Sequence, residues 1–293
     1  MIQYLTRNQI NEGLYNTCIS NAVNSRIYAY SWYLDLVCDD WCLLVRDNYK
    51  TVMPLPIRKK YGIHYIYLAP WIQQLGVFSK ENIESFIVKE FINSIPTKFK
   101  LIDFFLNADN VIDSKYIRER DNFILPLNKT YKNIRKQYSK GRKSSIKQVE
   151  KFNLSIVNNY NHEKIIQLFK DNKGVELKKN KADYDILSNL INTALSLKLV
   201  ECVAVINEGN VLIGGAFFLK DAQRITYLFS AINTEGREKQ AMSYLIDTMI
   251  NRYAETESIL DFEGSMIYKL ASFFKSFGAE KENYLHFKKY QLY

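Results

Sequence analysis

The hydrophobic pattern of the chain is most regular between residues 200 and 278, where short β-rich runs give way to helical spacing. The turn Glu208-Gly209-Asn210 separates two of these runs and predicts a hairpin. The predicted elements are the strands Val200–Asn207, Val211–Lys220 and Ile225–Ala231, a helix from Met242 to Tyr253, a buried parallel strand Ile259–Phe262, and a helix Tyr268–Phe277 ended by Gly278. This order predicts an α/β fold built on a mixed sheet.

The first half of the chain has the same order of elements. We expect a helix beginning at Thr6 or Asn8 and ending near Asn24, with Ile10, Leu14, Ile19 and Val23 facing inward. The elements predicted after it are the strands Trp41–Arg46, Lys50–Ile57 and Ile63–Leu68, a helix Lys80–Ile95 capped by Ser79, and the strand Leu101–Leu106.

The two halves can be aligned in a single register. Asp103 and Asp261 lie 158 residues apart within matching tripeptides, Ile-Asp-Phe and Leu-Asp-Phe. The same offset places the apolar positions of the first-half helix on those of the Met242 helix. We therefore predict two related domains, residues 1–128 and 129–293.

Composition narrows the class of protein. Apolar residues make up 47% of the 293 residues, which is enough for a packed core, and no apolar run approaches the about 20 residues that span a bilayer. The first residues lack the apolar core of a signal peptide, so we expect a cytoplasmic protein without an integral membrane association. The net charge of +9 favours acidic or phosphate-bearing partners.

Cysteine and histidine give little support for metal or disulfide chemistry. Cys38 and Cys42 have no second pair and no nearby histidine, and the chain holds only three histidines. We expect buried or unreactive thiols and no metal site.

A basic segment, residues 129–151, lies between the halves. Its candidate phosphate-binding or RNA-binding residues are Arg135, Lys136, Arg142, Lys143 and Lys147. Its apolar side is Tyr131, Ile134, Tyr138, Ile146 and Val149, and we expect Gly141 to divide it into two helices. Two interpretations remain open, a solvated helix face or a surface whose cations each neutralise one phosphate.

Two motifs resemble a known family. The strand end Asp261-Phe262-Glu263-Gly264 and the sequence Phe274-Lys275-x-Phe277-Gly278 resemble the GNAT superfamily, and within it the Fem-like peptidyl and aminoacyl transferases, whose signature is FKxxFG. The segment Arg142–Lys147 resembles their basic R-x-x-I-K stretch, so that the likeness covers roughly residues 100–290. The resemblance implies two tandem GNAT-like domains with a substrate cleft between them, aminoacyl-tRNA as donor and a cell-wall precursor as acceptor.

The loop before the Met242 helix departs from the acetyltransferase pattern. Members that use acetyl-CoA carry a Q/R-x-x-G-x-G/A loop whose backbone N–H groups hold the pyrophosphate. Here Gln240 and Met242 fill the two small-residue positions, and only Gly236 remains in a donor loop that includes Arg237 and Lys239. This favours a donor other than acetyl-CoA and no tightly bound cofactor.

Four residues of the second half are candidates for catalysis. The Fem-like pattern suggests that Lys275 stabilises the developing oxyanion, although a surface lysine is the alternative. Asp261 and Glu263 lie near the carboxyl end of a parallel strand, where one of them could deprotonate an attacking ammonium group. Asp261 has a structural alternative because Asp103 repeats it. Tyr227 could orient substrate, and a core tyrosine is the alternative.

In the first half, a polar and aromatic set could bind the acceptor. It consists of Arg58, Lys59, Tyr67, Gln73 and Gln74. An ordinary charged surface turn is the alternative.

We therefore expect an acyltransferase that moves an activated acyl or aminoacyl group to an amine acceptor. One alternative is an acetyl-CoA-dependent N-acetyltransferase, and another is a non-catalytic binding module on a degenerate GNAT fold. The sequence does not indicate an oligomeric state.

Overall fold

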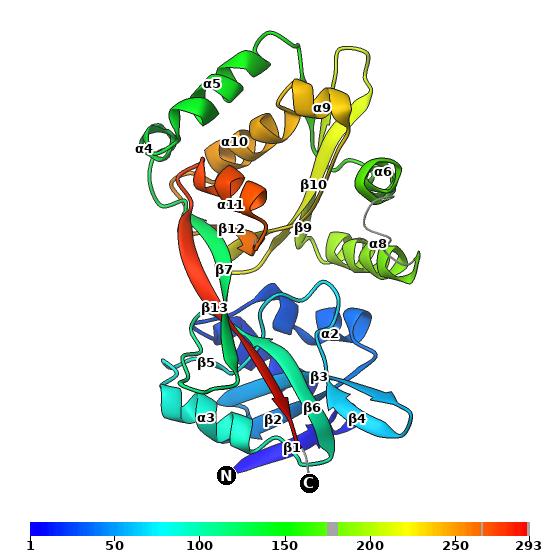
Figure 1. Cartoon of the computed structure of the whole chain (residues 1–293), viewed down its shortest axis with the longest axis vertical. Coiled ribbons are helices and arrows are strands. Elements are labelled where there is room, and N and C mark those ends of the chain that lie inside the picture. The colour runs from blue at the N-terminus through cyan, green and yellow to red at the C-terminus, as the bar shows by residue number, and fades with distance from the viewer. Residues whose placement is uncertain (175–180, 265, 292–293) are drawn as a thin grey trace. The chain divides into compact units, whose positions relative to one another are not determined.

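The computed structural model describes residues 1–174, 181–264 and 266–291. The chain forms two compact units (Figure 1). Unit 1 contains Met1–Asp121 and the stretch from Glu282 onward, and unit 2 is Asn122–Lys281. Each unit is a mixed sheet with helices packed on it, as the α/β prediction requires.

Unit 1 is built on a sheet in the order β1-β2-β3-β4-β6-β13, in which only β4 and β6 run parallel and β5 pairs with β3. Its strands are β1 (Ile2–Thr6), β2 (Asp40–Arg46), β3 (Thr51–Lys60), β4 (Ile63–Ile66), β5 (Phe78–Ser79), β6 (Phe99–Leu106) and most of β13 (Glu280–Tyr290). Its helical elements are η1 (Arg7–Gln9), α1 (Glu12–Asn21), η2 (Ile27–Ala29), α2 (Ser31–Val37) and α3 (Ser85–Asn93).

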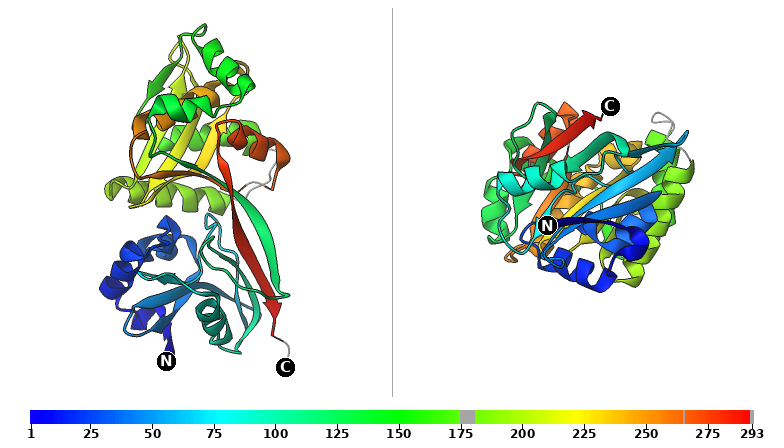
Figure 2. Two further views of the ribbon diagram at one scale, coloured as in Figure 1. Left: turned by 90° about the vertical axis from the view of Figure 1, so that its left-hand side faces the viewer. Right: turned by 90° about the horizontal axis from the view of Figure 1, so that it is seen from below.

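The helices of unit 1 cover both faces of its sheet (Figure 2). Cys42 and Leu44 of β2 belong to the same core cluster as Phe91 of α3. The neighbouring residue Trp41 packs instead on Tyr15 of α1, with ring centroids 5.2 Å apart. Because successive side chains of a strand point to opposite faces, α3 and α1 lie on opposite sides.

Unit 2 repeats this topology in the order β7-β12-β11-β10-β9-β8, in which only β11 and β12 are parallel. Its strands are the second half of β7 (Ile117–Pro126), β8 (Ser155–Val157), β9 (Val200–Ile206), β10 (Leu212–Lys220), β11 (Arg224–Ile232) and β12 (Ile259–Gly264). Its helical elements are α4 (Tyr131–Lys136), α5 (Lys140–Val149), α6 (His162–Phe169), the π-helix η3 (Lys170–Gly174), α8 (Lys181–Ser196), α9 (Thr234–Glu238), α10 (Ala241–Tyr253) and α11 (Tyr268–Lys275).

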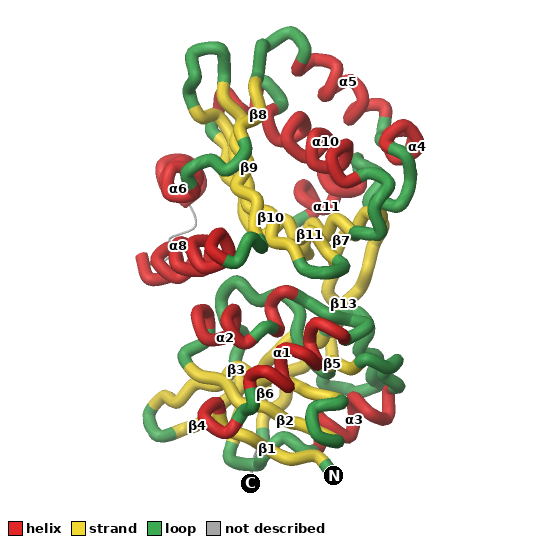
Figure 3. Tube along the Cα trace, turned by 180° about the vertical axis from the view of Figure 1, so that it is seen from behind, coloured by secondary structure: helices red, strands yellow, loops and turns green. Residues whose placement is uncertain are grey.

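The helices of unit 2 also lie on both faces of the sheet. Helices α6 and α8 are on one side of β9 and β10, and α10 and α11 are on the other (Figures 1 and 3). The aliphatic residues of α10 fill one core cluster with Val203 of β9, Phe218 of β10 and Phe274 of α11.

The internal repeat is visible in the elements themselves. Shifted by the 158-residue offset, α3 falls inside α10 and the end of β6 coincides with the end of β12. Each helix connects the two parallel strands of its own unit.

The unit boundaries differ from the predicted domains 1–128 and 129–293. The division falls within β7, after Asp121, and the last strand β13 returns to unit 1, where Leu285–Tyr290 pairs with Leu101–Leu106. Strand β7 completes the sheet of unit 2 in the corresponding place, beside β12. Unit 1 thus takes a strand from the far end of the chain, which no local pattern indicates.

Three predicted helices need correction. The first residues form strand β1, so the first helix begins only at Glu12, and Leu14 and Val23 are exposed rather than inward. The helix expected from Lys80 begins at Ser85, because Ser79 belongs to β5. The basic segment breaks before Ser139, which caps α5, and Gly141 lies inside that helix.

Candidate active site

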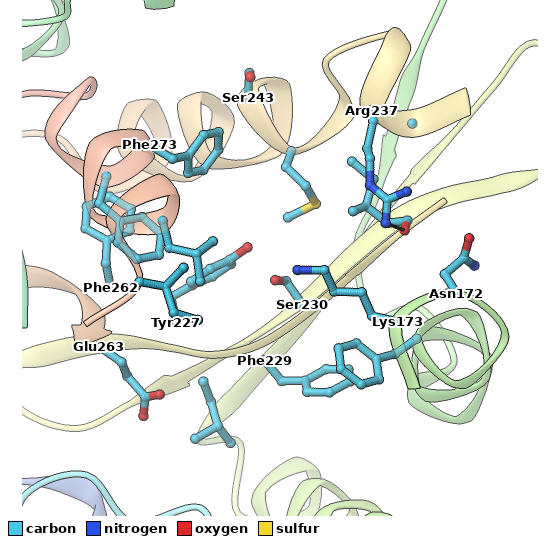
Figure 4. A pocket seen from close by; sticks show the side chains of 18 of the residues that line it. Asn172, Lys173, Tyr227, Phe229, Ser230, Arg237, Ser243, Phe262, Glu263 and Phe273 are labelled. Atoms are coloured by element: carbon cyan, nitrogen blue, oxygen red, sulfur yellow. Dashed lines mark hydrogen bonds between the residues drawn. The ribbon is translucent and has the colours of Figure 1, made fainter. Parts of the chain in front are cut away.

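A cavity of about 570 Å³ opens in unit 2 where strands β11 and β12 separate. Their parallel pairing runs only from Arg224 with Ile259 to Thr226 with Asp261. Beyond those pairs both strands contribute side chains to the lining of the cavity (Figure 4). The lining side chains come from β11, β12, α10, α11 and the α6–η3 region: Phe169, Asn172, Lys173, Tyr227, Leu228, Phe229, Ser230, Ile232, Gly236, Arg237, Gln240, Met242, Ser243, Phe262, Glu263, Gly264, Ile267, Leu270, Phe273 and Phe274.

One end of the cavity is aromatic. The rings of Phe262 and Phe274 stack with centroids 4.8 Å apart, and Tyr227 meets Phe274 edge-on at 6.2 Å. Burial raises the pKa of Tyr227 well above its usual value, so its hydroxyl remains a proton donor at neutral pH. Tyr227, a predicted catalytic residue, thus lines the cavity as a protonated phenol.

The other end of the cavity is basic. Lys173 of η3 and Arg237 of α9 extend into it from the side opposite Phe262 and Phe273 (Figure 4). Both side chains are exposed, and neither pairs with a carboxylate in the described ranges 1–174, 181–264 and 266–291. Two uncompensated cations beside an apolar cavity favour an anionic group on the ligand.

Asp261, a predicted base, has a structural role. Its side chain is 1% exposed and forms an ion pair with Nη1 of Arg224 at 2.8 Å. Its second oxygen accepts hydrogen bonds from Nδ2 of Asn122 at 3.0 Å and from the backbone N–H of Glu263 at 2.9 Å. A carboxylate so fully engaged cannot accept a proton from substrate without breaking these bonds.

Glu263, the other predicted base, lines the cavity. The pairing of β12 with β7 is interrupted between Asp261 and Gly264, and Glu263 has a φ of 59°. On a regular strand, residues two apart such as Asp261 and Glu263 would share one face, and this bulge disrupts that alternation. A left-handed conformation is unfavourable for a glutamate, and such strain gathers at functional sites.

The donor loop contains less free backbone than an acetyltransferase loop needs. Residues 234–238 form the short helix α9, in which Oδ1 of Asn233 accepts the N–H of Gly236 at 2.8 Å. The N–H groups of Arg237 and Lys239 donate to the carbonyls of Asn233 and Glu235. A side chain at Gly236 would meet the carbonyl oxygen of Ile213 at 2.2 Å, so this glycine is required by packing.

Lys275 lies away from the cavity. It ends α11, its side chain is exposed, and its ammonium lies over the ring of Phe123 at 5.3 Å. The neighbouring Phe273 and Phe274 line the cavity, but Lys275 does not. The geometry therefore matches the alternative of a surface lysine.

The basic segment divides into an exposed set and one buried residue. Lys136, Lys143 and Lys147 are exposed, and Arg135 is half-buried with its guanidinium 5.9 Å from the ring of Tyr131. Lys143 donates to the carbonyl oxygen of Lys136 at 2.9 Å. The exposed set remains able to contact phosphates.

Arg142 is the buried exception. Its guanidinium lies between the rings of Phe273 and Phe277, at 4.4 and 4.5 Å, and donates to Oγ of Ser276 at 2.9 Å and to Oγ of Ser243. Burial lowers the pKa of Arg142 to about 10. Its place between α5, α10 and α11 corrects the prediction that it contacts RNA.

The predicted acceptor residues of unit 1 are mostly held by internal contacts. Arg58 forms a double hydrogen bond with Asp39 and lies 4.1 Å from the ring of Tyr67, whose hydroxyl bonds to the same carboxylate. Gln74 is fully buried and accepts the N–H of Ala108 at 3.0 Å. Gln73 is half-buried and accepts from Gln74, and only Lys59 is exposed without such a contact in the described chain.

Sequence reasoning missed several residues of the site. Lys173 and Asn172 lie on a π-helix that has no periodic signal, and Ser230 lies within the aromatic strand β11. Arg224 is the partner of Asp261, and the parallel register of β11 and β12 could have indicated it. That register pairs Thr226 with Asp261, so that Arg224 lies two residues before the residue opposite Asp261.

Two general absences apply to the described residues. No group of three histidine, cysteine, aspartate or glutamate side chains among them could hold a metal ion. None of the helices that the structure describes has the length and hydropathy to span a membrane.

All four cysteines are free, and burial raises the pKa of Cys202 to about 12.

Comparison with solved structures identifies the fold. FemX matches with a TM-score of 0.70 over 97% of this chain and 96% of that chain, at 12% sequence identity. The L-PGS of Bacillus licheniformis matches with a TM-score of 0.52 over 87% of this chain and 86% of that one, at 12% identity. The C-terminal domain of a putative lysylphosphatidylglycerol synthetase from Agrobacterium fabrum matches with a TM-score of 0.53 over 84% of each chain, at 8% identity.

No protein-family model matches the sequence, and the search of curated proteins finds no match. The solved structures therefore establish the fold of the chain. The chain has the fold of FemX over 97% of its length, in agreement with the Fem-like resemblance of the two motifs.

Proposed function

We propose that the unit 2 cavity is the site of an acyltransferase that moves an acyl or aminoacyl group from a phosphate-bearing carrier to an amine. The single observation that carries this proposal is the division of the cavity into an aromatic end and a basic end. An acyl ester of an anionic carrier has the same two parts. The aromatic end suits the acyl group, and Lys173 with Arg237 suits the carrier phosphates.

Glu263 acts as the general base. An ammonium acceptor must lose a proton before it can attack, and Glu263 is the carboxylate that lines the cavity. The amine nitrogen then bonds to the acyl carbon, the ester C–O bond breaks, and the proton passes from Glu263 to the released oxygen. Tyr227 donates a hydrogen bond to the oxyanion that forms on the acyl oxygen.

The resemblance to the Fem-like branch suggests the substrates. It makes the donor an aminoacyl-tRNA and the acceptor the amine of a cell-wall (peptidoglycan) precursor. The exposed lysines of α4 and α5 supply a basic surface for the RNA. We assign the reaction to the cytoplasm, where charged tRNA is available.

One observation favours acetyl-CoA as a second candidate donor. Helix α10 begins at a left-handed Gln240 without a side-chain cap, and Met242 and Ser243 of its first turn line the cavity. An uncapped helix start attracts phosphate groups. The occupied N–H groups of Gly236, Arg237 and Lys239 weigh against a full pyrophosphate cradle.

The test supplies each donor in turn with a mixture of amine acceptors. We expect transfer of labelled amino acids from charged tRNA, and neither transfer from acetyl-CoA nor a thermal shift with CoA. A CoA-bound protein at about 100 times its Kd would be stabilised by about 2.7 kcal/mol, which a thermal shift detects. Transfer from acetyl-CoA alone would establish the second candidate, and binding without transfer from any donor would indicate a binding module.

A further inference from the structure

Unit 1 contains a second hollow that the proposed function does not use. It has a volume of about 430 Å³ and lies where the start of β7 meets the end of β13. The backbone N–H of Lys288 donates to the carbonyl oxygen of Tyr116 at 2.9 Å, which joins the two segments. The lining residues are Lys115, Tyr116, Ile117, Arg118, His286, Lys288 and Tyr290.

One side of the hollow is fixed by a half-buried polar network. Asp103 of β6 accepts hydrogen bonds from Nε2 of His286 at 2.6 Å and from Nζ of Lys288 at 2.8 Å. Nη2 of Arg120 lies 3.4 Å from Nδ1 of His286 and donates to it. Burial alone would raise the pKa of Asp103, but the hydrogen bonds from His286 and Lys288 outweigh burial and lower that pKa. The carboxylate of Asp103 is therefore ionised and already paired with these two residues.

Two further cations in the hollow are not compensated. Arg118 and Lys115 are exposed, and neither meets a carboxylate among residues 1–174, 181–264 and 266–291. The hydrogen bond and the charge of Asp103 raise the pKa of Lys288, and the positive charge of Arg118 opposes that rise. The hollow is therefore net positive, because Lys115, Arg118 and Lys288 surround the single carboxylate of Asp103.

Two exposed tyrosines adjoin these cations. Tyr290 is 61% exposed and Tyr116 is 36% exposed, although large aromatic side chains are usually more buried. The ammonium groups of Lys115 and Lys289 lie 5.3 and 5.5 Å from the ring of Tyr116. Aromatic faces beside cations are how proteins hold unpaired bases and their phosphates together.

We propose that this hollow binds a phosphorylated nucleoside, as part of single-stranded RNA or as a free nucleotide. Lys115, Arg118 and Lys288 contact the phosphate, and Tyr116 and Tyr290 offer rings on which the base stacks. The volume suits one nucleotide, since it lies within the range of small-ligand sites. This site goes beyond the proposed transfer reaction, because it lies in the other unit and takes no part in the chemistry.

The test measures fluorescence anisotropy of a labelled single-stranded RNA hexamer against the full chain over a range of salt concentrations. The variant Lys115→Ala/Arg118→Ala removes two phosphate contacts. We expect it to bind about tenfold more weakly, and to flatten the slope of log affinity against log salt by about 1.4. The control Lys80→Ala/Lys89→Ala removes the same charge from exposed positions elsewhere in unit 1 and should bind like wild type.

A second variant tests the stacking. Tyr290→Ala should lower the affinity for the RNA hexamer several-fold without changing the slope of log affinity against log salt, because it removes a ring and no charge. Competition by AMP separates the two sources of the nucleotide. A hexamer that binds more tightly than AMP identifies RNA as the ligand, and equal affinities identify a free nucleotide.

Two results would overturn the proposal. One is wild-type affinity and salt slope in the Lys115→Ala/Arg118→Ala variant, which would locate RNA binding elsewhere, for example on α4 and α5. The other is an oligoglutamate peptide that competes where AMP does not, which would mean that the site recognises carboxylates. Binding is measured without any transfer, so the fate of the proposed transferase reaction does not affect either result.

Discussion

Asp261 holds the backbone of Glu263 through a hydrogen bond of 2.9 Å from the Glu263 N–H to its Oδ1. The other oxygen of Asp261 is paired with the buried Arg224. The bulge that turns Glu263 to a φ of 59° is therefore anchored by a buried ion pair. Asp261 therefore contributes to stability and Glu263 to the proposed catalysis. Substitutions at each residue can distinguish the two roles.

Asp261→Asn should lower the free energy of unfolding by about 3 kcal/mol, because it leaves Arg224 as a buried charge without its partner. Urea denaturation measures this loss. The exposed Glu257 provides the matched control, and Glu257→Gln should change stability by less than about 0.5 kcal/mol. Equal stability of both variants would mean that the ion pair does not anchor the bulge.

Glu263→Gly and Glu263→Ala should both abolish transfer but differ in stability. Glycine adopts a positive φ without steric cost, whereas alanine keeps the strain. We expect the glycine variant to be more stable than the alanine variant by about 1 kcal/mol. Thermal and urea unfolding check this order, and an alanine variant of equal or greater stability would argue against a strained Glu263.

Tyr227→Phe should reduce the rate of transfer by about 100-fold, because it removes the proposed hydrogen bond to the oxyanion. The raised pKa of Tyr227 has a consequence for wild type. The phenol stays protonated through pH 9, so the rate should show no loss from tyrosine ionisation up to that pH. A pH–rate profile of both proteins tests the two expectations, and an unchanged rate in the variant would remove Tyr227 from the mechanism.

The basic segment can be tested by separating its exposed lysines from Arg142. Lys136→Ala/Lys143→Ala/Lys147→Ala should flatten the salt slope of tRNA binding by about 2 and leave the melting temperature unchanged. Arg142→Ala should instead cost about 2 kcal/mol of stability, because it removes the cation between Phe273 and Phe277. A triple variant that melts early would show that the lysines are structural.

Most of the fold could be predicted because its elements carry local patterns. Hydrophobic periodicity correctly predicted the strands β2, β3, β6, β9, β10 and β11 and the helices α10 and α11. Gly278, with a φ of 82°, follows α11 as expected of a helix-ending glycine. The return of β13 to the sheet of unit 1 was not predictable, since a strand so far along the chain from its partner β6 finds it through tertiary contacts alone.

The candidate site was predicted in part. Tyr227 and Glu263 line the cavity, but the positive φ of Glu263 comes from the bulge and leaves no mark in a sequence that has no glycine there. Arg142 did carry a signal, because it lies four residues after Tyr138 and four before Ile146 on the apolar side of the segment. The charge of Arg142 favours an exposed position, whereas its spacing favours the buried position that it occupies.

The central claim is that Glu263 accepts the proton of the attacking amine within the unit 2 cavity. The most direct test is the single-turnover rate of amino acid transfer from charged tRNA, with Glu263→Gln compared to wild type at equal stability. Glutamine keeps the shape and the strained backbone and removes the base. We expect a rate at least about 100-fold lower in the variant. A variant that transfers as fast as wild type would contradict the mechanism.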